Sequence, residues 1–467
     1  MSYLKFDELL QSIGSYFSIK NGSLTIENLS DLRKSKLDSL VYHSIFCEDP
    51  EIKKGLRRLI REAAIKSGAI PASIQSFYEA KAKGKYANLT VPAINIRGLT
   101  YDTARAIFRC ARETDSSAFL FEIAKSEIGY TKQKPDEYST IILAAALREE
   151  FAGPIFIQGD HFQINAKRYL QNPDEEIAEL RELIKEAIEA DFYNIDIDAS
   201  TTVDLSKTTV DEQQFSNYDI TAMLTKFIRD NEPEGITVSV GGEIGEVGGK
   251  NSTVEELKAF LSGYKKSLES KSRGAKGLSK ISVQTGTSHG GVVLPDGSIA
   301  KVKLDFDALK ALSKEAKKMG LSGAVQHGAS TLPEEAFDRF PQTDTAEIHL
   351  ATGFQNIVMD SSNLPVQLKN RMIEYIHDTF ISEKKEGETD EQFVYKTRKK
   401  VFGPFKKELL EMPSESRSAI SRELEERFVL LFKKLNAINT CGFIRESIKT
   451  PIIEKALPES LKKLLEH

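Results

Sequence analysis

Three histidines in the middle of the chain each follow a short apolar run, and histidine is a residue type that commonly binds metal ions. His161 stands in GDHF, His289 in GTSHGG and His327 in HGAST. Imidazole nitrogen binds zinc and similar ions, and three such ligands leave a position open for substrate, as in catalytic zinc sites. A lone histidine at such a place is more often a hydrogen-bonded strand cap, so the shared placement carries the argument. We expect these three residues to bind a divalent metal ion.

Carboxylates accompany these histidines. Asp160 directly precedes His161, and because neighbours on an extended strand face opposite ways, the two side chains should point differently, with Asp160 acting as an acid or base. Asp196 and Asp198 are two residues apart and should face the same side, where a metal role and a salt bridge to a lysine or arginine both remain open. Glu243 ends another apolar run, at the root of a glycine-rich loop.

Eight short apolar runs alternate with amphipathic, helix-like segments from Val91 onward. The runs are VPAINI, SAFLFEI, GPIFIQG, FYNIDID, ITVSVGGEI, KISVQTG, GAVQHG and FQNIVMD. Regular alternation of this kind predicts parallel strands with right-handed crossovers, and eight units favour a closed (β/α)8 TIM barrel over an open sheet. In such barrels the catalytic side chains lie at the carboxyl ends of the strands. The remaining histidines, which we assign to the surface or to packing, are His43, His349, His377 and His467.

The barrel has extensions at both ends. We expect a helical N-terminal extension over residues 1–90, the barrel domain over 91–365 and a helical C-terminal extension over 366–467. The C-terminal helices are strongly charged, as in EKKEGETDEQFVYKTRKK. Amphipathic helices of this kind usually serve packing or oligomer contacts.

The composition excludes several classes of protein. A net charge of −5 argues against a general nucleic-acid surface, which normally shows a basic excess. The three cysteines, Cys47, Cys110 and Cys441, form no CxxC pair, so neither a disulfide framework nor a thiolate zinc site is indicated and a reducing cytoplasm is expected. We find no signal peptide and no apolar run that predicts a membrane span.

The ordered set of motifs resembles the class II fructose-bisphosphate and tagatose-bisphosphate aldolases. The similarity runs from about Val91 to about Asp360 through VPAINIRG, GDHF, NIDIDAS, GEIGEVGG, GTSHGG, HGAST and FQNIVMD. It implies a lyase that cleaves a ketose phosphate such as fructose 1,6-bisphosphate to dihydroxyacetone phosphate and an aldehyde. The resemblance also implies a role in glycolysis or related carbohydrate metabolism and a homo-oligomer, either dimer or tetramer.

The resemblance also implies roles for individual residues. Zn²⁺, or another divalent metal, is bound by the three histidines, and Asp160 shuttles the proton of the substrate's C4 hydroxyl. Asp198 and Glu243 hold an alternative or second metal position, and Na⁺ or K⁺ can assist phosphate binding. The residues that cradle the dihydroxyacetone phosphate end are Gly290, Gly328 and Ser330, and Asn356 contacts the enediolate.

One departure from the family's pattern lies at the expected phosphate site. The family's eighth strand continues from asparagine into an Asp-Thr pair that contacts phosphate, whereas this chain has Val358 and Met359, so we expect a weaker phosphate contact.

Two functions other than aldolase remain open. The first is the non-catalytic partner subunit of tagatose-bisphosphate aldolase, to which the segment FLFEIAKSE is similar. A metal-dependent sugar isomerase is the second, because the fold alone does not determine the chemistry.

Overall fold

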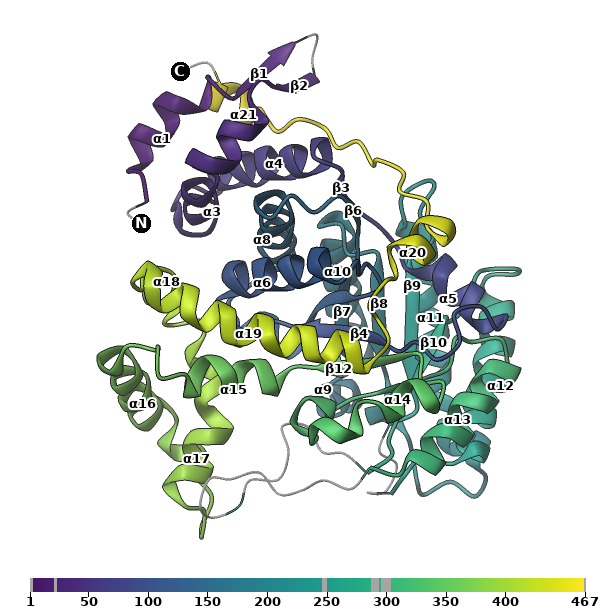
Figure 1. Ribbon diagram of the computed structural model, residues 1–467. Coiled ribbons are helices and arrows are strands. Elements are labelled where there is room, and N and C mark those ends of the chain that lie inside the picture. The colour runs from purple at the N-terminus through teal and green to yellow at the C-terminus, as the bar shows by residue number, and fades with distance from the viewer. Residues whose placement is uncertain (1–2, 21–22, 246–249, 287–293, 295–303, 466–467) are drawn as a thin grey trace.

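A closed barrel of eight parallel strands forms the centre of the molecule (Figure 1). The computed structural model describes residues 3–20, 23–245, 250–286, 294 and 304–465. The strands are β4 (Val91–Asn95), β5 (Leu120–Ala124), β7 (Ile157–Gln163), β8 (Asn194–Asp198), β9 (Ser239–Glu243), β10 (Lys280–Val283), β11 (Ala324–Gln326) and β12 (Glu347–Leu350). They close in the order β10-β11-β12-β4-β5-β7-β8-β9. The expected (β/α)8 barrel is confirmed.

The eighth strand is not the one expected from the sequence. It is β12, formed by EIHL, whereas FQNIVMD lies in helix α15 (Thr352–Asp360). A short apolar run is compatible with either structure when periodicity is the only guide. In α15, Phe354 and Val358 are four residues apart and both buried, so the apolar side chains form one helix face. The prediction for this strand was wrong.

Helices alternate with the strands around the barrel (Figure 1). They are α6 (Thr100–Glu113), α7 (Lys125–Thr131), α8 (Pro135–Arg148), α9 (Ala166–Gln171), α10 (Pro173–Glu189), α11 (Val210–Asn231), α12 (Val254–Lys271), α13 (Phe306–Lys318), α14 (Arg339–Gln342) and α15. Local sequence sets several of their starts: Thr209 with Glu212, and Thr253 with Glu256, form capping boxes on α11 and α12. Within the described ranges, no helix combines the length and the apolar character needed to cross a bilayer.

The N-terminal extension contains strands as well as helices, so the expectation of helices throughout was wrong in part. Its elements are α1 (Phe6–Ile13), β1 (Phe17–Lys20), β2 (Ser23–Ile26), α2 (Leu29–Asp31), α3 (Leu37–Phe46), α4 (Pro50–Lys66), β3 (Ala69–Pro71) and α5 (Gln75–Ala82). β1 and β2 form an antiparallel hairpin. β3 pairs with β6 (Gly153–Ile155), the first part of the run GPIFIQG, and so joins this extension to the barrel.

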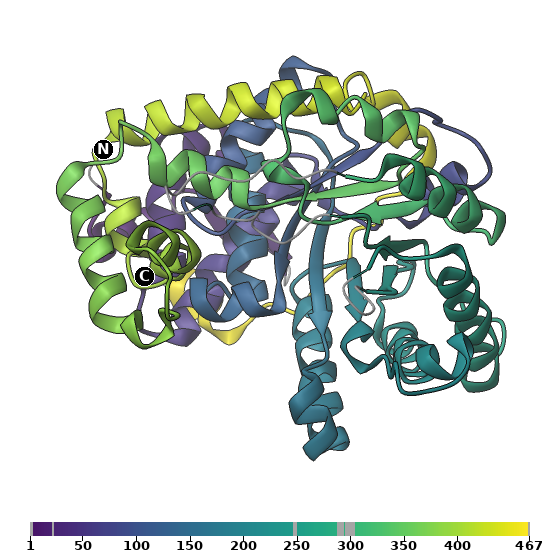
Figure 2. The ribbon, with the colours of Figure 1, turned by 90° about the horizontal axis from the view of Figure 1, so that it is seen from below.

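The C-terminal extension wraps around the barrel and returns to the N-terminal helices. Its elements are α16 (Val366–Phe380), α17 (Asp390–Thr397), the 3-10 turn η7 (Arg398–Val401), α18 (Lys406–Leu410), α19 (Ser414–Lys434), α20 (Cys441–Ser447) and α21 (Glu459–Leu465). The long helix α19 lies along the top of Figure 2 and packs on α6, where Arg109 pairs with Glu425 at 2.7 Å. α21 packs on α4, so the two chain ends lie on the same side of the molecule (Figure 1).

The segment after η7 packs so closely against the barrel that a methyl group added to either glycine of the contact would clash. A Cβ added to Gly98 would lie 2.0 Å from the ring of Phe402, and one added to Gly403 would lie 2.2 Å from the backbone oxygen of Tyr130. Lys406 extends the contact by donating a hydrogen bond to the carbonyl oxygen of Lys132 at 2.7 Å. The position of η7 relative to the barrel is therefore set by close packing.

We predict that Gly403→Ala destabilises the protein by about 1–3 kcal/mol, because the new methyl group meets backbone that must shift to make room. The midpoint of urea unfolding measures this change. Gly442→Ala is the matched control, since a Cβ there would meet nothing within 4 Å and its midpoint should be nearly unchanged. Equal midpoints for the two variants would contradict the close packing of this segment.

Candidate functional site

A β-bulge in β7 turns two consecutive residues toward the barrel interior. The register of β7 against β8 shifts between Gly159 and Phe162, and His161 between them has a φ of +41°. Gly159 has no side chain where a Cβ would lie 2.4 Å from the Phe162 ring. As a result Asp160 Oδ1 and His161 Nε2 lie 3.9 Å apart. The expectation that these neighbours point differently was wrong, because a bulge interrupts the alternation of an extended strand.

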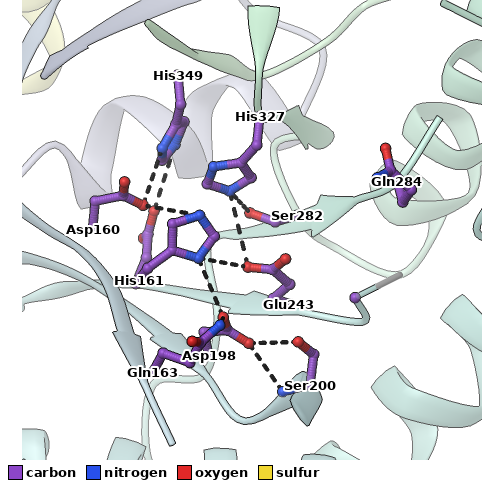
Figure 3. A network of polar contacts seen from close by, with 12 residues as sticks. Asp160, His161, Gln163, Asp198, Ser200, Glu243, Ser282, Gln284, His327 and His349 are labelled. Carbon is purple, nitrogen blue, oxygen red and sulfur yellow. Dashed lines mark hydrogen bonds and ion pairs between the residues drawn. The ribbon is translucent and has the colours of Figure 1, made fainter. Parts of the chain in front are cut away.

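The imidazole of His161 lies at the centre of a polar cluster (Figure 3). Its Nδ1 is 3.2 Å from Asp198 Oδ2 and 3.2 Å from Glu243 Oε2. The same Glu243 oxygen is 4.0 Å from His327 Nε2, and the rings of His161 and His327 have centroids 4.2 Å apart. The structure therefore brings together five of the predicted site residues, which are Asp160, His161, Asp198, Glu243 and His327.

Hydrogen bonds hold Asp198 in this orientation. Its Oδ1 accepts from the backbone N–H of Ser200 at 3.0 Å and from the Ser200 hydroxyl at 2.6 Å, while Gln163 donates to Oδ2. Groups that fix a carboxylate in this way keep it in position for a metal or an imidazole.

The buried carboxylates of the cluster favour a positive charge among them. Burial opposes the charged imidazole, but Asp160 and Glu243 raise the pKa of His161 well above its usual range. Burial likewise opposes the charge on Asp160, yet His161 and His349 hold the pKa of that carboxyl well below its usual range. Burial, followed by the nearby Asp198, raises the pKa of Glu243 to about 7. A cation placed among these groups relieves repulsion between the carboxylates.

A second polar layer lies deeper in the barrel, around the fully buried Lys280. Its Nζ is 2.9 Å from Asp196 Oδ2, donates to Gln158 Oε1 at 2.7 Å and pairs with Glu347. Tyr78 also donates a hydrogen bond to Glu347. For Asp196 the salt-bridge alternative is the one the structure supports, whereas Asp198, two residues later, lies at the imidazoles.

His349 connects the two layers, and the sequence analysis missed it. Its Nδ1 is 3.2 Å from Asp160 Oδ1 and 3.1 Å from Glu122 Oε2, and its Nε2 is 2.7 Å from Glu347 Oε1. The ring centroid lies 4.1 Å from that of His327. Burial opposes its charge, but Glu122 and Asp160 raise the pKa of His349 well above its usual range. The available signal was EIHL, where polar residues alternate with apolar ones as in NIDID.

The cluster opens into a cavity of about 840 Å³. Asp160, His161, His327 and His349 line it, together with the predicted substrate-binding residues Gly328 and Ser330. Gly328 has a φ of +67°, a conformation that suits glycine, and the hydroxyl of Ser330 accepts a hydrogen bond from the backbone N–H of Gly353 at 3.1 Å. A cavity of this size accommodates a sugar phosphate.

The structure does not bring Asn356 to this cavity. Asn356 lies in α15, where it accepts a hydrogen bond from Arg398 at 2.6 Å and donates one to Tyr395 at 3.0 Å. His289 and Gly290, the other predicted residues, lie outside the described residues.

The corrected eighth strand changes the comparison at the phosphate end. Ala351 and Thr352 follow β12, and both line the cavity. Val358 and Met359 lie in α15, buried in the hydrophobic core, and are not the residues that follow a barrel strand. The sequence-based reason for expecting a weak phosphate contact therefore no longer applies.

The donor set fits a divalent metal ion. Candidate ligand atoms of Asp160, His161 and His327 lie within 4.8 Å of one another, as do those of His161, Asp198 and Glu243. The barrel interior holds six carboxylates, namely Glu122, Asp160, Asp196, Asp198, Glu243 and Glu347. Among the described residues, Lys280 is the one lysine or arginine that pairs with any of them. Imidazole and carboxylate ligands with this excess of negative charge suit zinc or a similar ion.

A family model described as class-II fructose-bisphosphate aldolase matches residues 73–417. A search among curated proteins returned no match.

Solved structures of similar fold include the fructuronate-tagaturonate epimerase UxaE from Cohnella laeviribosi in complex with glycerol. That structure is 12% identical, with a TM-score of 0.56, and the match covers 82% of this chain and 85% of that chain. The fructose-bisphosphate aldolase Fba from Campylobacter jejuni is 15% identical over 80% of this chain and 98% of its own, with a TM-score of 0.46. The YdjI aldolase from Escherichia coli K12 is 17% identical over 74% and 99%, with a TM-score of 0.42. At these identities the epimerase shows likeness of fold alone.

We predict that Lys280→Met destabilises the protein by about 3–5 kcal/mol, because it leaves Asp196 and Glu347 buried without their cation. Chemical denaturation measures the loss. Lys226→Met is the matched control: it breaks an exposed pair with Asp230 and should cost less than about 1 kcal/mol. If Lys280→Met does not fold, adding Glu347→Gln should restore part of the stability. Equal costs for the two lysines would show that the buried pairs do not support the barrel.

Proposed function

Because the chain belongs to the class-II fructose-bisphosphate aldolase family, we propose that its cavity catalyses the reversible aldol cleavage of a phosphorylated ketose. The observation that carries this proposal is the convergence of two imidazoles and three carboxylates at the carboxyl ends of the barrel strands. Fructose 1,6-bisphosphate is the default substrate by family. Its products are dihydroxyacetone phosphate and an aldehyde.

We assign a divalent metal ion, zinc in the first instance, to His161 and His327, with His289 as the third proposed ligand. Asp198 and Glu243 provide further ligands or a second position. Such an ion, when bound, would supply Lewis-acid stabilisation of the negative charge that develops on the substrate oxygens. The chain's own contribution is to orient the imidazoles, and the contacts of Asp198 and Glu243 with His161 Nδ1 do this.

Asp160 is the proposed base. Its carboxyl group lines the cavity, where it is placed to accept the proton of the C4 hydroxyl. His349 Nδ1, 3.2 Å away, holds the carboxylate toward the cavity. In the reverse direction Asp160 returns the proton as the bond forms.

Gly328 and Ser330 are proposed to bind the phosphate of the dihydroxyacetone end, with Gly290 as a further candidate and Na⁺ or K⁺ as an accessory ion. Both described residues line the cavity beside His327. Asn356 has no place in this proposal, because its side chain is bonded to Tyr395 and Arg398 away from the cavity. A homo-oligomer acting in the cytoplasm completes the proposal on the strength of the family.

Epimerisation of a ketose is the second candidate, and His349 favours it. A buried imidazole beside Asp160 gives the site a second group able to exchange a proton with substrate carbon or oxygen. The similar fold of the fructuronate-tagaturonate epimerase is compatible with this reaction. Epimerisation converts the ketose into its epimer without breaking a C–C bond, whereas aldol cleavage yields two smaller carbonyl compounds.

The test is product analysis with the purified protein, a panel of ketose phosphates and hexuronates, and a chelator control. We expect dihydroxyacetone phosphate and an aldehyde to accumulate from a ketose bisphosphate, and a chelator to stop the reaction until metal is restored. A new hexose isomer without any triose would favour the epimerase. A metal-free protein without activity would favour the non-catalytic partner subunit.

Three substitutions should separate metal binding from proton transfer. His161→Ala should lose both the ion and the activity, because it removes a ligand, as should His327→Ala. Asp160→Asn should keep the ion while turnover falls by roughly two to four orders of magnitude, because only the proton acceptor is lost. Metal analysis and kcat of the same preparations measure both effects. Loss of metal in Asp160→Asn would assign that residue to metal binding instead.

A further inference from the structure

Helix α5 of the N-terminal extension packs against the amino-terminal ends of the barrel strands, opposite the proposed site. Ile74, which directly precedes α5, donates a backbone hydrogen bond to the side chain of Asn194, the first residue of β8, at 2.9 Å. The amide of Asn194 in turn donates to the carbonyl oxygen of Ile157, the first residue of β7, at 3.0 Å. Tyr78 of α5 is fully buried and shares a hydrophobic cluster with Val91, the first residue of β4. Its side chain therefore belongs to the amino-terminal end of the barrel.

The hydroxyl of Tyr78 reaches the deeper polar layer, where it donates a hydrogen bond to Glu347 Oε2. The other polar partners of this carboxylate, Lys280, Gln158 and His349, all contact Oε1. Among the described residues, Tyr78 is therefore the one donor to Oε2. Burial, followed by Glu347, raises the pKa of Tyr78 well above its usual range, so the hydroxyl keeps its proton and remains a donor. Without this hydroxyl, one oxygen of a buried carboxylate would have no hydrogen bond.

Glu347 connects Tyr78 to the proposed base. Glu347 and His349 are two residues apart on β12, so their side chains lie on the same face of the strand, with Glu347 Oε1 at 2.7 Å from His349 Nε2. His349 Nδ1 is 3.2 Å from Asp160 Oδ1 (Figure 3). A continuous line of polar contacts thus crosses the barrel interior, from α5 to the cavity wall that Asp160 forms. All four side chains are buried, so little water competes for these contacts.

We propose that Tyr78 is a positioning residue of the site: it holds the carboxylate of Glu347, which fixes the ring of His349, which in turn holds Asp160 toward the cavity. This role rests on the function proposed above, in which Asp160 is the base. Tyr78 does not line the cavity and therefore does not touch substrate. Its hydroxyl should consequently affect the rate of the proton transfer and not the binding of substrate. Helix α5 thereby contributes to the geometry of a site at the opposite end of the barrel.

Tyr78→Phe, which keeps the ring and removes only the hydroxyl, tests this role. We expect kcat to fall about tenfold while KM changes by less than about twofold, because the substitution moves the base without touching substrate. Tyr264→Phe serves as the control: it removes another buried tyrosine hydroxyl, bonded to Thr225 at 3.1 Å between α12 and α11, and should leave kcat unchanged. In a His349→Asn background, Tyr78→Phe should lower kcat no further, since its effect passes through His349.

A heteronuclear NMR spectrum of isotope-labelled histidine side chains gives a second readout that needs no turnover. The signal of His349 is identified as the one that disappears in His349→Asn. We expect Tyr78→Phe to shift this signal and Tyr264→Phe to leave it in place. If Tyr78→Phe does not fold, Glu347→Gln provides the test, because it changes the next contact of the same line and should shift the same signal.

The proposal is overturned if the His349 signal stays in place in Tyr78→Phe, or in Glu347→Gln where that variant replaces it. It is also overturned if a cleaving enzyme keeps its kcat in Tyr78→Phe, if Tyr264→Phe lowers kcat equally, or if Tyr78→Phe causes its full loss in the His349→Asn background. A shifted His349 signal in a protein that cleaves no ketose would instead contradict the proposed reaction and leave the positioning of His349 by Tyr78 in place.

Discussion

Excess negative charge inside the barrel is the constraint on which the rest of the site depends. Six carboxylates share an interior that apolar side chains fill in most barrels of this class, and burying unpaired charge is costly. Lys280 neutralises part of the deeper layer. Nearer the carboxyl ends of the strands the carboxylates face imidazoles, whose pKa values they raise. This end of the barrel is consequently suited to holding a cation.

The two layers have different tasks. The deeper layer is built on Lys280, Gln158 and Glu347, whose side chains bond to one another. These contacts support the layer above it. The upper one opens to the cavity and gathers groups whose protonation can change. His349 contacts both, through Glu347 below and Asp160 above. The contact with His349 holds Asp160, the proposed base, in position.

The barrel does not form the cavity alone. Its wall includes Lys399 from the C-terminal extension, and the close contacts at Gly98 and Gly403 fix the position of that segment against the barrel. Arg398, which directly precedes Lys399, pairs with Asp360 of α15 at 2.7 Å. The extension is therefore packed beside the site, and the family model extends to residue 417, beyond the last barrel strand.

The sequence by itself determined the barrel and the residue types at its carboxyl end. Strand and helix alternate along the chain, and parallel strands in a closed barrel end on one rim, so His161, His327, Asp198 and Glu243 had to meet there. The short run FQNIVMD misled the assignment of the last strand, and His349 was missed with it, because a few apolar residues fit a helix face as well as a strand.

Only the tertiary structure decided the remaining features. The bulge that turns Asp160 and His161 inward depends on how the Phe162 ring packs against Gly159, a contact that periodicity does not encode. The separation of Asp196 from Asp198 depends on Lys280, which arrives from a strand 84 residues later. The place of Lys399 depends on the path of a whole extension around the barrel. In each case the partner is distant in sequence, and local pattern carries no information about it.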